Sequence, residues 1–324
     1  MSAPEPSSCI SLVRVFKLPK ALPEVDLPLP AIYLPEKIAH SEFIAVRGLR
    51  YHVHLWGDAT LPKLFLFHGW MDVGASFQFL VDAFKQDWHV IAPDWRGFGL
   101  SEWPQDGYYF PDYIGDMDAI LHHYSPNEPV NLIGHSMGGN VAGLYAGARP
   151  EKVKKLIALE GFGLPRTAPD KAPGRYTKWL DELRETQSFR PYKNFTEVAQ
   201  RLQKTNPRLP DDKAAFLARH WSHALTNGDV VLNSDPRHKT SNPILYRIEE
   251  AFACWDAITA PTLWVIADET DLIAKWIKED DATFALRKKP MKYYSEAIIK
   301  NAGHMLHHDQ PEALAEIIEQ FLDK

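Results

Sequence analysis

Hydrophobic and polar positions follow two periods along this chain and predict strands that alternate with helices. Strands buried on both faces are expected where the apolar run is continuous, at residues 63–67, 89–93, 129–133, 155–159 and 261–267. Helices with one buried face are expected where apolar residues recur every three or four positions, at residues 76–84, 112–124 and 311–322. This alternation predicts an α/β fold, with a mostly parallel central sheet covered by helices on both faces.

The first strands have a different pattern. Residues 42–46 and 49–55 alternate between apolar and polar positions around a turn at Arg47 and Gly48, which predicts a two-stranded hairpin. His52 and His54 fall on one face of the second strand. Because no third metal ligand lies nearby in the sequence, we interpret that face as solvated.

The alternation stops between residues 163 and 258. That segment has helix-like stretches at 176–185, 195–204 and 211–225, a short turn or hairpin near 230–237, and no buried strand of the parallel type. We expect a mainly helical cap domain at 163–258, inserted in a core domain formed by 41–162 and 259–324. The sheet should resume with a strand at 261–267, a helix at 275–286 and a last strand at 292–299. The proline-rich residues 1–40 exclude regular structure and predict an extended arm that lies partly on the body.

The most informative motif is Gly-His-Ser-Met-Gly at residues 134–138. It lies between a buried-type strand and a helix rich in small residues, which is the setting of a nucleophile elbow. The glycines permit a very tight turn that exposes Ser136. The helix that follows should point free amides at the reaction site, so the amide of Met137 is a candidate oxyanion donor.

A serine nucleophile needs a base and an acid. His304 is the preferred base because it follows Gly303 in the loop after the last predicted strand, with His307 and His308 as close alternatives. Asp271 is the preferred acid, after the strand that ends at Ala267. The alternatives that remain open for the acid all follow predicted strands, and they are Glu160, Asp268 and Glu269.

The second oxyanion donor should come from the loop after the first buried strand. His68 and Gly69 end that strand, and Gly69 would let the backbone approach the elbow closely, so the amide of Trp70 is the candidate. His68 is expected to pack beside the turn at Gly69 rather than act as the base.

Composition narrows the possible partners. A net charge of −6 and a pI near 6.2 argue against binding to nucleic acid. Two cysteines, Cys9 and Cys254, cannot form a disulfide framework or a metal cluster and favour a reducing compartment. The sequence has no apolar run of ~20 residues and no secretory leader pattern. We therefore expect a cytoplasmic protein without a membrane span, a metal or an organic cofactor.

Four motifs together resemble the α/β-hydrolase superfamily, in the branch with a serine nucleophile and a helical cap. They are His-Gly-Trp at 68–70, Asp-Trp-Arg-Gly-Phe-Gly-Leu-Ser at 94–101, the elbow at 134–139 and Gly-His at 303–304. The resemblance covers residues 41–324 and implies that Ser136 is the nucleophile, His304 the base, and Trp70 and Met137 the oxyanion donors. Its usual acid turn is a glycine with an aspartate three residues later. Here Ala267 and Thr270 occupy those places, and Asp271 comes one residue after them.

These observations predict hydrolysis of carboxylic esters through an acyl-enzyme, by a monomer or homodimer. The haloalkane dehalogenase and epoxide hydrolase branches use an aspartate nucleophile, so Ser136 argues against both. Aromatic residues of the cap predict a substrate with an apolar or aromatic part, although the cap core is the favoured place for each ring taken singly; they are Trp179, Phe216, Trp221 and Trp255. The alternatives are hydrolysis of a C–C bond, thioester or amide on the same triad, perhydrolysis, or a ligand receptor without catalysis.

Overall fold

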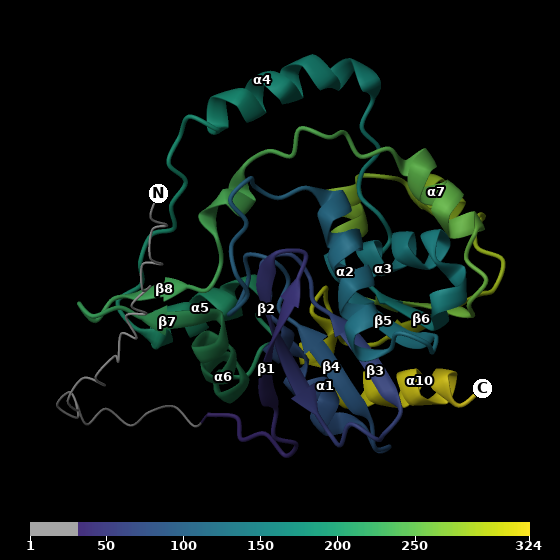
Figure 1. The fold of residues 1–324 in the computed structure, drawn as a ribbon, viewed down its shortest axis with the longest axis horizontal. Helices are drawn as coiled ribbons and strands as arrows, with labels where there is room; N and C mark the ends of the chain where they lie inside the picture. The colour runs from purple at the N-terminus through teal and green to yellow at the C-terminus, as the bar shows by residue number, and fades with distance from the viewer. Residues whose placement is uncertain (1–31) are drawn as a thin grey trace, which may run out of the picture.

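A computed structural model describes residues 32–324 and shows an eight-stranded mixed sheet (Figure 1). In spatial order the strands are β1 (His40–Val46), β2 (Leu49–Trp56), β4 (His89–Pro93), β3 (Lys63–Phe67), β5 (Val130–His135), β6 (Val153–Leu159), β9 (Thr262–Ala267) and β10 (Tyr294–Ile299). The strands from β4 to β10 run parallel, and β1 and β2 pair antiparallel at one edge. The predicted fold class is confirmed.

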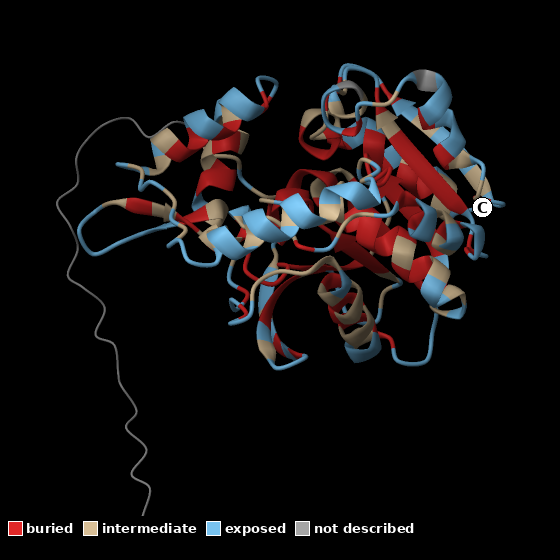
Figure 2. Ribbon diagram, turned by 90° about the horizontal axis from the view of Figure 1, so that it is seen from above, coloured by how far each residue is buried: buried red, intermediate tan, exposed pale blue. Residues whose placement is uncertain are grey.

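Helices cover both faces of the sheet, because its parallel strands are apolar on both sides. On one face lie α2 (Phe110–Tyr124), α3 (Met137–Ala148) and α7 (Ile248–Asp256), whose side chains share a core with β5 and β6. The other face carries α1 (Gln78–Ala83), α9 (Leu306–Asp309) and α10 (Pro311–Leu322). The strands between these two layers form the most deeply buried part of the molecule (Figure 2).

The segment between β6 and β9 contains helices and one small hairpin. The helices are α4 (Ala172–Glu182), α5 (Phe195–Thr205), α6 (Asp211–Trp221) and α7, and the hairpin joins β7 (Ser222–Ala224) to β8 (Val230–Leu232). A separate apolar cluster holds α5 and α6 together. α4 has no buried residue and is mostly exposed in Figure 2. The cap boundaries at 163 and 258 stay predictions.

Two expected helices differ from those observed. The helix expected at 211–225 ends at Trp221, because Ser222 adopts an extended conformation and starts β7. The helix expected at 275–286 is replaced by a π-helical turn at Leu272–Ile277 and the short α8 (Asp281–Ala285). Lys278 between them has a left-handed backbone (φ 55°), which a continuous helix does not permit.

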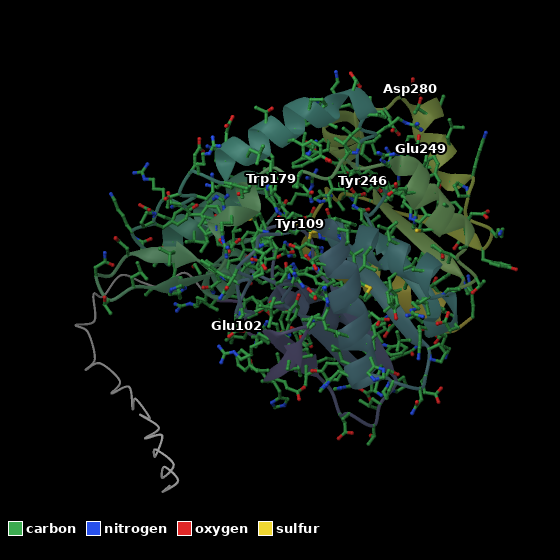
Figure 3. The ribbon with its side chains drawn as sticks, turned by 45° about the horizontal axis from the view of Figure 1, so that its top comes forward. Glu102, Tyr109, Trp179, Tyr246, Glu249 and Asp280 are labelled. Atoms are coloured by element: carbon green, nitrogen blue, oxygen red, sulfur yellow. The ribbon has the colours of Figure 1, made fainter. Side chains whose placement is uncertain are left out.

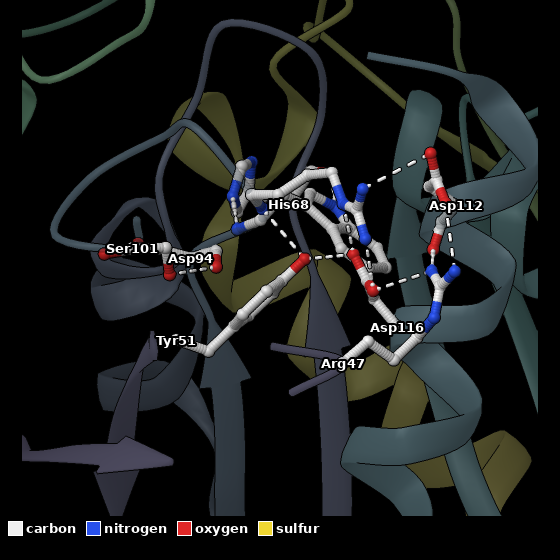
Figure 4. Close-up of polar contacts among 9 residues, drawn as sticks. Arg47, Tyr51, His68, Asp94, Ser101, Asp112 and Asp116 are labelled. Carbon is white, nitrogen blue, oxygen red and sulfur yellow. Dashed lines mark hydrogen bonds and ion pairs between the residues drawn. The ribbon is translucent and has the colours of Figure 1, made fainter. Parts of the chain in front are cut away.

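The loop after β4 is held by buried charges (Figure 4). Arg96 donates to both carboxylate oxygens of Asp116 at 2.5 and 2.6 Å, and Tyr51 donates to the same carboxylate. Asp94 accepts hydrogen bonds from His52 Nδ1 (2.8 Å), the amide of Gly74 (2.7 Å) and the amide of Leu100 (3.0 Å). These contacts explain the motif at 94–101 as structural, since a buried carboxylate is stable only when it is paired or hydrogen-bonded.

The solvated face expected for His52 and His54 is wrong. Both histidines are buried, and His52 Nδ1 lies in hydrogen-bond contact with Asp94. The two residues are close to Asp94 only after β2 and β4 pair, so the sequence interval between them conceals the contact.

The arm reaches the described part of the structure at Ile32, and its residues 1–31 lie outside the described residues. Tyr33 donates to Asp82 of α1 at 2.8 Å, and its amide donates to the carbonyl of Asp212 on α6 at 3.1 Å. The Tyr33 ring also packs edge-on against Phe79 and Phe216. This segment therefore joins the core layer to the segment between β6 and β9.

Candidate active site

Ser136 lies on the tight turn between β5 and α3. Its backbone has φ 50° and ψ −112°, a rarely populated conformation that costs about 1–3 kcal/mol and persists only where the surroundings enforce it. A Cβ on Gly134 would come within 2.4 Å of the Gly138 backbone, and one on Gly138 within 2.1 Å of the Phe67 carbonyl oxygen. Only glycine therefore fits at these two positions, as expected for an elbow.

His304 lies in the loop between β10 and α9, next to this turn. His135 Nε2 donates to the carbonyl of His304 at 2.8 Å, and the two ring centroids are 4.8 Å apart. Because His135 is the chain neighbour of Ser136, this contact ties the histidine loop to the elbow. The side chain of His304 is 31% exposed, so solvent reaches part of it.

Glu160 is the carboxylate that the structure brings to His304. Its Oε2 lies 3.4 Å from His304 Nδ1, and its side chain is fully buried. The amide of Ala267 donates to Oε1 at 2.8 Å, and the hydroxyl of Thr270 donates to Oε2 at 2.5 Å. Glu160 also has a left-handed backbone (φ 55°), a further strained residue beside the elbow.

Asp271, the acid preferred from sequence, is placed differently. Its side chain is 56% exposed and pairs with Lys275 at 2.5 Å, and within residues 32–324 no hydrogen bond or ion pair joins it to His304. Lys275 is the main cause of the lowered pKa of Asp271, as in a surface ion pair, and the charge of nearby His304 makes a smaller contribution. Asp268 and Glu269 also have other partners, Lys300 and Arg208. Glu160, the alternative left open from sequence, occupies the place expected for Asp271.

The loop after β3 approaches the elbow closely. A Cβ on Gly69 would lie 3.3 Å from Ser136 Cβ, which places the backbone of neighbouring Trp70 near the serine. Met137 is the first residue of α3, so its amide has no acceptor within the helix. Both candidate oxyanion donors thus lie on segments next to Ser136.

His68 holds this loop, as the sequence indicated. Its Nε2 accepts the amide hydrogen of Trp95 at 2.9 Å, and its Nδ1 donates to the Gly69 carbonyl at 2.7 Å. Burial lowers the pKa of His68, so the ring is neutral. With both ring nitrogens engaged in backbone contacts, His68 is a structural residue.

Comparison with known proteins identifies the family of this chain. The family model described as the alpha/beta hydrolase fold matches residues 62–311. The chain belongs to this family. It is 26% identical over 275 residues to a serine hydrolase-like protein of Danio rerio, covering 83% of each chain. It is 25% identical over 300 residues to epoxide hydrolase 4 of Mus musculus, covering 85% of this chain and 77% of the relative. A solved structure of a thioesterase domain from the curacin biosynthetic pathway superposes with a TM-score of 0.79 at 25% identity, covering 87% of this chain and 99% of that one.

This α/β hydrolase exposes several large apolar side chains on the segments that follow its parallel strands. Trp70 follows β3, Leu164 follows β6 and Trp276 follows β9, and each is between 37 and 62% exposed. Figure 3 shows Trp179 on α4 and Tyr246 in the segment that precedes α7. Trp255 is instead buried against Trp264, so it belongs to the core.

Two buried groups of side chains contain metal-ligating residue types: His52 with His54 and Asp94, and Asp72 with His135 and His307. In the first group Asp94 already accepts three hydrogen bonds. Sequence reasoning missed the second group because Asp72 stands in a loop with no recognisable motif. His307 and His308, considered as alternative bases, are both buried behind the elbow. None of the helices within residues 32–324 has the length and apolar character needed to cross a bilayer.

Proposed function

We propose that this protein is a serine hydrolase that cleaves carboxylic esters through an acyl-enzyme intermediate. Ser136 is the nucleophile, His304 the base and Glu160 the acid, with the amides of Trp70 and Met137 as oxyanion donors. Glu160 replaces Asp271, which we preferred from sequence. The observation that carries the proposal is the strained serine beside a histidine whose Nδ1 lies 3.4 Å from a fully buried carboxylate.

The geometry supports these proposed roles. Glu160 accepts the Nδ1 hydrogen of His304, which leaves the lone pair of Nε2 to take the proton of Ser136. A 3.4 Å contact is long for a hydrogen bond, as contacts of this kind often are before substrate binds. Hydrogen bonds from the amide of Ala267 and the hydroxyl of Thr270 fix the Glu160 carboxylate in place. His304 would then protonate the leaving alcohol and activate water to release the acid.

An apolar or aromatic acyl or alcohol group is the substrate part best supported. The exposed side chains of Trp70, Leu164 and Trp276 follow strands at the same edge of the sheet as Ser136. Ligand sites in such folds combine apolar walls with a few polar groups that orient the substrate.

Other reactions fit the same residues. A thioesterase domain is among the structural neighbours, and its chemistry would use the same acyl-enzyme. A relative is named an epoxide hydrolase, but our proposal places a serine where that branch uses an aspartate. Hydrolysis of a C–C bond or an amide, perhydrolysis and a receptor without catalysis remain alternatives for experiment.

The test compares Ser136→Ala with the parent on a panel of p-nitrophenyl esters, acyl thioesters and amides. We expect ester turnover to fall by at least about 10³-fold, because the nucleophile is removed. Ser188→Ala, at an exposed serine, is the matched control and should keep full activity. Covalent labelling of Ser136 by a fluorophosphonate, read by mass spectrometry, should disappear in the first variant only. Residual ester turnover within tenfold of the parent would contradict the assignment, and preference for thioesters or amides would change the substrate class.

A further inference from the structure

The second buried group, formed by Asp72, His135 and His307, has the composition of a metal site. One potential ligand atom from each residue lies within 4.8 Å of the other two. All three side chains are almost completely buried, with 3%, 1% and 0% exposed. The three come from separate segments: the loop after β3, the end of β5 and the helix α9.

Each of these side chains has a polar atom with no hydrogen-bond partner among the described residues. These atoms are Asp72 Oδ2, His135 Nδ1 and His307 Nδ1. Native structures leave few buried polar atoms unpaired, so three together call for a ligand or ordered water. The nitrogen of His307 that faces Asp72 is Nε2, which lies 3.8 Å from Oδ2, beyond hydrogen-bond distance, and 3.5 Å from the Ser76 hydroxyl; its unpaired nitrogen is Nδ1.

The tautomer of His135 follows from its other contact. His135 Nε2 donates to the His304 carbonyl, so Nε2 carries the hydrogen and Nδ1 carries the lone pair. A neutral imidazole whose other nitrogen donates to a carbonyl is the usual form of a metal-ligating histidine. Gly69 carries no Cβ to crowd Nδ1, since a Cβ there would lie only 2.9 Å from that atom.

We propose that Asp72, His135 and His307 form a binding site for a divalent transition-metal ion of the Zn²⁺ class. Two imidazole nitrogens and one carboxylate oxygen suit zinc and related ions, with a water in the fourth position. Ligands held ~2.1 Å from zinc are about 3.4 Å apart in tetrahedral geometry. The ligand atoms, now within 4.8 Å of one another, therefore have to move together by up to about 1.4 Å around the ion.

An ion bound here would connect the segments that carry the candidate catalytic residues. Asp72 is two residues after Trp70, His135 directly precedes Ser136, and His307 is three residues after His304. The ion would therefore cross-link the three loops that carry the candidate oxyanion donor, nucleophile and base. Because it binds the folded protein only, it should raise the melting temperature as its concentration rises.

The site can be tested by metal binding, independently of enzymatic activity. The full-length protein is stripped with a chelator and titrated with Zn²⁺ in equilibrium dialysis, and with Co²⁺ by visible absorption. We expect one Zn²⁺ per chain, a rise in melting temperature, and the intense Co²⁺ bands of a four-coordinate site. Asp72→Asn and His307→Gln should each weaken binding by at least about tenfold.

Two controls separate the site from other histidines. His54→Gln alters the other buried group, and His122→Gln removes an exposed histidine, so both should bind like the parent. His307→Cys replaces one zinc ligand with another and should retain binding, with a new thiolate-to-cobalt band in the near ultraviolet. This gain of signal does not depend on whether the two loss variants fold.

The main competing explanation is a buried water that hydrogen-bonds these three side chains. In that case the parent would bind no stoichiometric metal ion at 100-fold excess over protein, and the proposal would be overturned. Equal loss of binding in His122→Gln or His54→Gln would overturn it as well. Absence of the thiolate band in a folded His307→Cys protein treated with Co²⁺ would also overturn the proposal.

Discussion

Glu160→Gln is the substitution that most directly examines the proposed triad. Glutamine keeps the size of the side chain and an acceptor for the amide of Ala267, but removes the negative charge beside His304. It also presents an amide NH₂ that cannot accept the Nδ1 hydrogen. The histidine would then lose both the charge that stabilises its protonated form and the partner that fixes its tautomer.

The expected loss of turnover follows from the distance between the charges of Glu160 and His304. Two unit charges 3.4 Å apart interact by about 5 kcal/mol at an effective dielectric constant of about 20. His304 is 31% exposed, and solvent screening reduces this to about 3–4 kcal/mol, a loss of kcat of roughly 10²- to 10³-fold. Stability should fall by only about 1–2 kcal/mol, because one charge-assisted hydrogen bond from Thr270 is weakened.

The assay is kcat on the best ester of the panel, with the melting temperature as a check on folding. Asp271→Asn is the matched carboxylate-to-amide control, and we expect less than about twofold change, since its partner is an i,i+4 surface lysine. Thr270→Asp added to Glu160→Gln should recover at least tenfold, because Thr270 Oγ1 lies 2.5 Å from the oxygen that faces His304. Folded variants in which Asp271→Asn loses more turnover than Glu160→Gln would refute this reasoning.

Two other predictions concern stability. Removing residues 1–35 deletes the Tyr33 contacts with Asp82 and α6 and should lower the melting temperature while the kcat on esters is retained; an unchanged melting temperature and elution volume would show that the arm contributes nothing. Burial lowers the pKa of His238 to about 3, so the folded state favours the neutral ring. The part of the unfolding free energy that depends on this neutral ring is complete above pH 6.5, and it is lost as the pH falls from 6.5 towards 3. At pH 4.5 that loss is roughly 3 kcal/mol, and His238→Phe, which keeps the stacking on Phe98, should reduce it in urea unfolding at several pH values. An identical pH dependence in parent and variant would contradict the argument.

Local patterns were sufficient for much of the fold. Continuous apolar runs identified β3 and β4 with their observed bounds, and helical spacing did the same for α10. The Gly-x-Ser-x-Gly spacing identified the turn at Ser136, because the steric requirement for glycine acts within five residues. Local patterns failed where backbone conformation broke an amphipathic run, as at Ser222 and Lys278.

The sequence by itself determined the fold class, the elbow and the loop that carries His304, since each depends on residues close together in the chain. The tertiary structure decided which carboxylate meets His304. Glu160 and Thr270 are 110 residues apart, and they touch only because β6 pairs with β9. The pairing that buried His52 against Asp94 and gathered Asp72, His135 and His307 was likewise invisible along the chain. Contacts between neighbouring strands depend on the strand order and register of the sheet, which no local pattern encodes.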